Sequence, residues 1–131
     1  MHLPHRLVTT LACATLLAAC SSMTMPWSSP APATVADGVY VGPNGMTLYT
    51  FDRDTMGAGK SMCNGPCATN WPPLMASAGD SAHGEWSIVT RDDGGHQWAY
   101  NGKPVYYWAK DAKPGDRTGD GFNNAWRLAR P

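Results

Sequence analysis

Short stretches of alternating hydrophobic and polar residues recur along the chain, each bounded by Gly, Pro, Asn or Asp. Alternation with a period of two between such turn residues is typical of strands that bury one face. The pattern predicts one short helical turn over residues 67–71, which Pro72 and Pro73 would end. It predicts strands over residues 39–41, 46–51, 86–91, 97–100, 105–108 and 125–129. The expected fold is therefore mainly β, built of antiparallel hairpins and a meander.

One of these hairpin patterns occurs twice. It consists of an Asn-Gly turn, an aliphatic residue and then Tyr-x-aromatic-x-x-Asp, in which the Asp closes a turn. The first copy contains Asn44, Gly45, Leu48, Tyr49, Phe51 and Asp54, and the second contains Asn101, Gly102, Val105, Tyr106, Trp108 and Asp111. The chain is thus expected to contain two degenerate repeats, over about residues 37–80 and 81–131.

The two copies are expected to share one aromatic core. Side chains of a strand alternate between its faces, so Tyr49 and Phe51 project from one face and Leu48 from the other. An isolated two-stranded hairpin is marginal in water, and so each copy needs the other to cover its apolar face. An exposed stacking platform for a ligand is the alternative. The residues expected in the core are Tyr49, Phe51, Trp71, Trp86, Trp98, Tyr106, Trp108 and Trp126.

Composition limits the chain to one small domain. It has 131 residues, 43% hydrophobic content and a formal net charge of zero. A balanced charge argues against nucleic acid, which needs a basic face. Gly59-Lys60-Ser61 is similar to a phosphate-binding loop, but Asp54 stands where that motif needs its first Gly, and a carboxylate would repel the phosphate. We therefore expect neither nucleic acid nor nucleotide as a partner.

The N-terminus carries an export signal. His2, His5 and Arg6 precede an apolar run over residues 7–17 that is too short to span a bilayer, which takes about 20 residues. The run ends in Leu-Ala-Ala-Cys at residues 17–20, which resembles a bacterial lipobox. This resemblance implies a signal peptide over 1–19 and a lipid on Cys20; secretion with cleavage after Ala19 and no lipid is the alternative.

Residues 20–36 then form a tether, because Ser, Pro and Ala predominate there and little apolar surface is available for a core. The folded domain is expected over 37–131. A lipid on Cys20 implies a membrane as partner and a location in the bacterial cell envelope. In a Gram-negative cell this would be the outer membrane, facing the periplasm.

Cys63 and Cys67 are the two cysteines left in the mature domain. An oxidising envelope favours a disulfide between them, and closing so short a loop contributes roughly 2 kcal/mol on the chain-entropy estimate. A copper-handling or thiol redox protein is the alternative, since thiolates select copper and His96 or His83 would complete a site. Met56 and Met62 are the nearby thioethers.

No residue pattern indicates catalysis. The sequence has no Ser-His-Asp set, close carboxylate pair or His-rich metal motif. Asp111, Asp116 and Asp120 lie among glycines at a spacing unsuited to calcium, and they are interpreted as turn residues. A non-enzymatic binding or structural module without a cofactor is therefore the expected function, with no catalytic residue.

Three blocks of the sequence together resemble a known family. They are the doubled Tyr-x-aromatic-x-x-Asp motif, the Cys-Asn-Gly-x-Cys-Ala-x-Asn-Trp-Pro-Pro block over 63–73, and the Arg-Asp-Asp-Gly and Gln-Trp-Ala-Tyr segments at 91–94 and 97–100. These blocks are similar to the bacterial secreted-repeat predicted lipoproteins, over about residues 38–131. The resemblance implies an envelope lipoprotein with two degenerate repeats.

Overall fold

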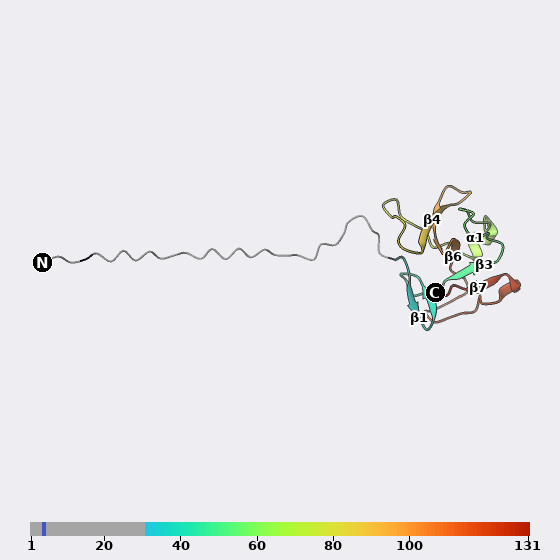
Figure 1. Cartoon of the computed structure of the whole chain (residues 1–131). Coiled ribbons are helices and arrows are strands. Elements are labelled where there is room, and N and C mark those ends of the chain that lie inside the picture. The colour runs from blue at the N-terminus through green and yellow to red at the C-terminus, as the bar shows by residue number, and fades with distance from the viewer. Residues whose placement is uncertain (1–3, 5–30) are drawn as a thin grey trace.

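The computed structural model describes residue 4 and residues 31–131, and in this part the chain is mainly β, as predicted (Figure 1). The predicted helical turn is present as α1, close to its expected bounds. None of the helices in the described part of the chain has the length and apolar character that crossing a bilayer requires. The elements are β1 (Thr34–Ala36), β2 (Val39–Val41), β3 (Tyr49–Phe51), α1 (Pro66–Asn70), β4 (Trp86–Thr90), β5 (His96–Tyr100), β6 (Lys103–Tyr106), the 3₁₀ turn η1 (Phe122–Asn124) and β7 (Trp126–Leu128).

The strands form two antiparallel sheets. β1 pairs with β2, and the other five follow the order β4-β5-β6-β3-β7. Asn101 and Gly102 both have positive φ, at 51° and 82°, which is the backbone of a tight two-residue hairpin turn between β5 and β6. The first copy turns more loosely, because Asn44 lies within a longer loop in which the Gly42 amide donates to the Met46 carbonyl at 2.9 Å.

The two repeats are interleaved in the five-stranded sheet. β3 of the first repeat lies between β6 and β7, both from the second repeat, with Tyr49 opposite Tyr106 and Phe51 opposite Trp126. Figure 1 shows the C-terminal strand β7 beside β3. The central strands of the two copies therefore pair directly with each other, so neither repeat is a separate unit.

Aromatic residues of both copies share one hydrophobic cluster, as predicted. Tyr49 and Tyr106 are fully buried at its centre. Because side chains alternate along β3 and β6, Leu48 and Val105 face the other way, and with Trp86 and Trp98 they form a second cluster. All eight aromatic residues predicted for the core are buried, but they divide between two clusters on opposite faces of the central strands.

The fold begins before residue 37, where composition placed its start. β1 pairs with β2 in the register Thr34 opposite Val41, and Ala33 is buried in the second cluster. Three small residues before Asp37 thus belong to a sheet although their composition resembles that of the tether. Pairing along the backbone requires no large side chain, which is why the pattern of hydrophobic residues did not show it.

Candidate functional site

The tyrosine and the aspartate of each motif copy bind their counterparts in the other copy. The Tyr49 hydroxyl donates to Asp111 Oδ2 at 2.7 Å, and the Tyr106 hydroxyl donates to Asp54 Oδ2 at 2.6 Å. All four residues are buried. With the two tyrosines directly opposite in the sheet, this exchange relates the two repeats by an approximate two-fold axis between β3 and β6.

Both aspartates also occupy the turn position predicted for them. The Asp54 amide donates to the Phe51 carbonyl and the Asp111 amide to the Trp108 carbonyl, each at 3.0 Å. Their remaining carboxylate oxygens accept further bonds: Asp54 Oδ1 from the Met62 amide at 2.7 Å, and Asp111 Oδ1 from the Thr118 amide at 3.0 Å. The motif aspartates therefore fix both a turn and the contact between repeats.

Burial sets the protonation of these pairs. It raises the pKa of Tyr49 and of Tyr106 far above the ordinary tyrosine value, and the hydrogen bonds to the two carboxylates raise it further. Burial also raises the pKa of Asp54, against the lowering effect of the Tyr106 and Met62 hydrogen bonds. The phenols thus stay protonated as donors. Among the described residues, every buried side-chain polar atom has a hydrogen-bond partner.

Cys63 and Cys67 form the predicted disulfide, with an S–S distance of 2.06 Å. Cys63 is fully buried, whereas Cys67, in α1, is half-buried. His96 is exposed on β5, where its ring contacts the Thr90 hydroxyl at 3.5 Å. Within residue 4 and residues 31–131 there is no group of three His, Cys, Asp or Glu residues that could hold a metal ion, so the structure does not bring the copper set of Cys63, Cys67 and His96 together.

A buried arginine, which the sequence did not single out, supports the disulfide loop. Arg91 Nη2 donates to the Cys63 carbonyl at 2.8 Å, and Nη1 donates to Gln97 Oε1 at 2.8 Å. Gln97 in turn donates to the Val105 carbonyl at 2.8 Å. Arg91 Nε pairs with the exposed Asp93 at 3.1 Å. The signal in the sequence was an Arg at the end of an alternating strand, followed by an Asp-Asp-Gly-Gly turn, a context that surface arginines share.

Three indole rings stack on the approximate axis. Trp71 lies parallel to Trp126 with ring centroids 3.7 Å apart, and on its other side it stacks on Trp108 at 3.9 Å. Gly119 lies so close to these rings that a Cβ there would be 2.7 Å from Trp71 Cη2. Trp71 and Trp126 each follow a helical turn, α1 or η1, in their own repeat.

A pocket of about 290 Å³ is lined by residues of both α1 and η1 and by two of these indoles, Trp71 and Trp126; we call it the axis pocket. Asn123 and Asn124 at its edge have positive φ, at 51° and 54°, an uncommon backbone for residues other than Gly. Arg53 is the charged residue in its lining. The lining residues are Phe51, Arg53, Cys67, Asn70, Trp71, Phe122, Asn123, Ala125 and Trp126.

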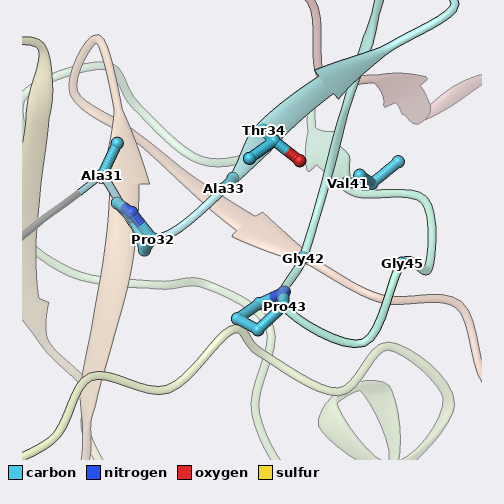
Figure 2. A pocket seen from close by; sticks show the side chains of 8 residues that line it. All are labelled: Ala31, Pro32, Ala33, Thr34, Val41, Gly42, Pro43 and Gly45. Atoms are coloured by element: carbon cyan, nitrogen blue, oxygen red, sulfur yellow. The ribbon is translucent and has the colours of Figure 1, made fainter.

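A second pocket, of about 300 Å³, lies where the chain enters the domain (Figure 2). Ala31, Pro32 and Ala33 form one side and Pro43 faces them across it, so most of its lining consists of small apolar residues. Its lining has no charged side chain, and Thr34 supplies the single side-chain hydroxyl. This pocket lies where the tether enters the sheet, and its lining has few polar groups that could bind a ligand.

The residues predicted to attach the protein to a membrane lie outside the described part of the chain. These are the signal peptide over 1–19 apart from residue 4, the lipid attachment residue Cys20 and most of the tether.

The comparisons agree with the two-repeat architecture. A protein-family model described as a secreted repeat of unknown function matches the chain twice, over residues 32–75 and 87–130. No curated protein and no solved structure matches the chain. The first match starts at the pocket of Figure 2 and includes β1, and the second ends just after β7.

Proposed function

Because this chain belongs to the family of secreted repeats of unknown function, we propose that it acts as a membrane-anchored, non-enzymatic binding module of the bacterial cell envelope. The observation that supports this proposal most directly is the exchange of Tyr-Asp pairs between the repeats. The repeated polar groups of the motif are buried and bound to one another, so the motif maintains the fold. We therefore expect a ligand to bind to surface residues outside the motif.

The axis pocket is the part of that surface best suited to a ligand. It combines aromatic walls with amide and guanidinium groups, the mixture typical of small-ligand sites. Among the described residues, the Arg53, Asn70 and Asn123 side chains have no hydrogen bond or ion pair, so they are available to a ligand. Asn123 in the lining also has a positive φ of 51°, and uncommon backbone conformations of this kind occur often at functional sites.

The membrane anchor is the lipid on Cys20. Between Cys20 and Ala33 the fully extended chain spans at most about 45 Å, at roughly 3.3 to 3.6 Å per residue. A domain tethered in this way stays within that distance of the membrane surface. In a Gram-negative cell we place it on the outer membrane, facing the periplasm.

Fractionation of cells tests the anchor. Wild-type protein should incorporate labelled palmitate and sediment with membranes, and Cys20→Ala should lose both properties. Cys13→Ala is the matched control, because that residue would be removed with the signal peptide, and it should behave as wild type. Membrane association of the Cys20→Ala protein, or absence of label in the wild type, would contradict the anchor.

Site-specific photo-crosslinking in living cells tests the binding surface. A crosslinking amino acid at Asn70, on the rim of the axis pocket, should yield a discrete adduct. The same amino acid at Lys60, which is exposed and outside the lining of the pocket, is the control. An adduct at Lys60 but not at Asn70 would show that binding occurs elsewhere.

A further inference from the structure

The two sulfur atoms of the disulfide differ in access. Cys63 has no exposed surface and belongs to the shared aromatic cluster, whereas Cys67 is half-buried and lines the axis pocket. Thiol–disulfide exchange requires an attacking thiolate to reach one sulfur while the other leaves. Cys67 is the residue of the pair that has exposed surface and lines the pocket, so a thiolate entering the pocket reaches Cys67 and not the buried Cys63.

The axis pocket favours an attacking thiol that carries negative charge. Arg53 is the one charged residue in the lining, and it forms no ion pair with any described residue. The unpartnered amides of Asn70 and Asn123 add hydrogen-bond donors beside it. A small thiol with an anionic group would therefore be held next to Cys67, whereas a cationic thiol would be repelled.

Burial of Cys63 among aromatic rings disfavours a thiolate there, and a buried cation nearby offsets part of that cost. The buried guanidinium of Arg91, which also pairs with the exposed Asp93, donates to the backbone carbonyl of Cys63. A nearby cation lowers the pKa of a thiol, and a thiol of lower pKa leaves faster in exchange. Access at Cys67 therefore sets the direction of bond cleavage, and the Arg91 guanidinium lowers the cost of forming a thiolate at the buried Cys63.

We propose that Cys63–Cys67 is an exchange-competent disulfide that reacts with small anionic thiols in the axis pocket. The thiolate attacks Cys67 Sγ, a bond forms between the two sulfurs, the Cys63–Cys67 bond breaks, and its electron pair leaves with Cys63 as a thiolate. A second thiolate then attacks the mixed disulfide at the sulfur of the bound thiol. Two small thiols are thereby oxidised to one disulfide, while Cys63 and Cys67 are reduced. This inference rests on the proposed role of the axis pocket and is independent of the lipid anchor.

Reduction of the intact full-length protein by three thiols of different charge tests the proposal. The probes are 2-mercaptoethanesulfonate (anionic), 2-mercaptoethanol (neutral) and cysteamine (cationic). Each reduction rate is divided by the concentration of the thiolate form. It is then divided by the rate at which the same thiol reduces a small linear disulfide, which removes differences in intrinsic reactivity. After acid quench and alkylation, peptide mass spectrometry should find the probe on Cys67 and the alkylating reagent on Cys63. The normalised rate should be highest for the anionic thiol, by about fivefold over the neutral one, the size expected of one exposed charge pair.

Arg53 variants supply the matched comparison. Arg53→Ala should abolish the preference for the anionic thiol, and Arg53→Lys should keep most of it. Lys60→Ala removes a positive charge outside the lining of the pocket and should leave the preference unchanged.

Probe found equally on Cys63, equal normalised rates for all three thiols in the wild type, or reduction only in denaturant would each overturn the proposal. If Asn70 still gives its crosslinked adduct in that case, the binding function stands and only the exchange reaction is excluded.

Discussion

Tyr49 donates its hydroxyl hydrogen to Asp111, a residue of the other repeat, across 2.7 Å in the buried interior. Removal of the hydroxyl in Tyr49→Phe should lower the free energy of unfolding by roughly 1.5 to 3 kcal/mol, the usual contribution of a hydrogen bond to a charged group. Urea unfolding measures the loss. Tyr107→Phe is the control, because the half-buried Tyr107 hydroxyl has no hydrogen bond with any described residue, and it should change stability little.

Double-mutant cycles distinguish pairing between repeats from pairing within a repeat. Tyr49→Phe should couple strongly with Asp111→Ala and weakly with Asp54→Ala, because interaction energies of about 0.5 to 3 kcal/mol arise between direct partners. Stronger coupling of Tyr49 with Asp54 would mean that each motif copy is self-contained and would contradict the exchanged arrangement.

Alkaline pH should weaken the fold through the same tyrosines. Their pKa is raised in the folded state, so the folded protein retains protons that the unfolded chain releases above its ordinary tyrosine pKa of about 10. The stability contributed by these protonated phenols is fully present below that pH and is lost as pH rises above it. Urea unfolding measured between pH 8 and 11 should show this fall. The fall should be smaller in the Tyr49→Phe, Tyr106→Phe double variant, and an equal fall would refute the assignment.

Neither half of the domain should fold alone. β3 of the first repeat pairs with β6 and β7 of the second repeat. The two repeats also share one hydrophobic cluster, in which truncation of Trp108 to Ala should lower the free energy of unfolding by about 3 to 5 kcal/mol. Residues 31–80 and 81–131, expressed separately, should give no cooperative melt, and mixing them should restore one. A cooperative transition in either half would show that the repeats are independent domains.

Gly119→Ala should destabilise the indole stack. The added Cβ would lie 2.7 Å from Trp71 Cη2 and 3.0 Å from Trp108 Cγ, and such overpacking costs about 1 to 3 kcal/mol. Gly79→Ala is the matched control, since nothing lies within 4 Å of its Cβ position. Thermal unfolding should separate the two variants, and equal midpoints would contradict the packing described around Gly119.

The strands and the aromatic core could be predicted because they depend on local alternation and on residue size. β4, β5 and the tail strand lie within one or two residues of their predicted bounds. Asp54 and Asp111 were correctly placed in turns, but their bonds to tyrosines of the other repeat depend on which strands pair. Strand order is a property of the whole chain that no single segment encodes.

The features that define the candidate site were harder to predict. The disulfide between Cys63 and Cys67 could be predicted, because these are the two cysteines of the mature domain and the cell envelope is oxidising; the structure contains it. The burial of Arg91 could not be predicted, because an arginine followed by two aspartates normally indicates a solvent-exposed turn, whereas Arg91 is buried. The axis pocket is lined by residues of α1 and η1, which are far apart in the sequence, and by stacked indoles, and only the three-dimensional arrangement shows this.

The exchanged Tyr-Asp bonds make the repeat self-complementary. A polypeptide with a single copy could satisfy its tyrosine and its aspartate only by joining an identical polypeptide about a two-fold axis, as in an isologous homodimer. In this protein both halves are covalently joined, so the same interface forms at any protein concentration. A duplicated unit can then diverge, and here one half contains a disulfide at 63–67 while the other has none. Linkage of the two halves thus permits an asymmetric site on a nearly symmetric scaffold.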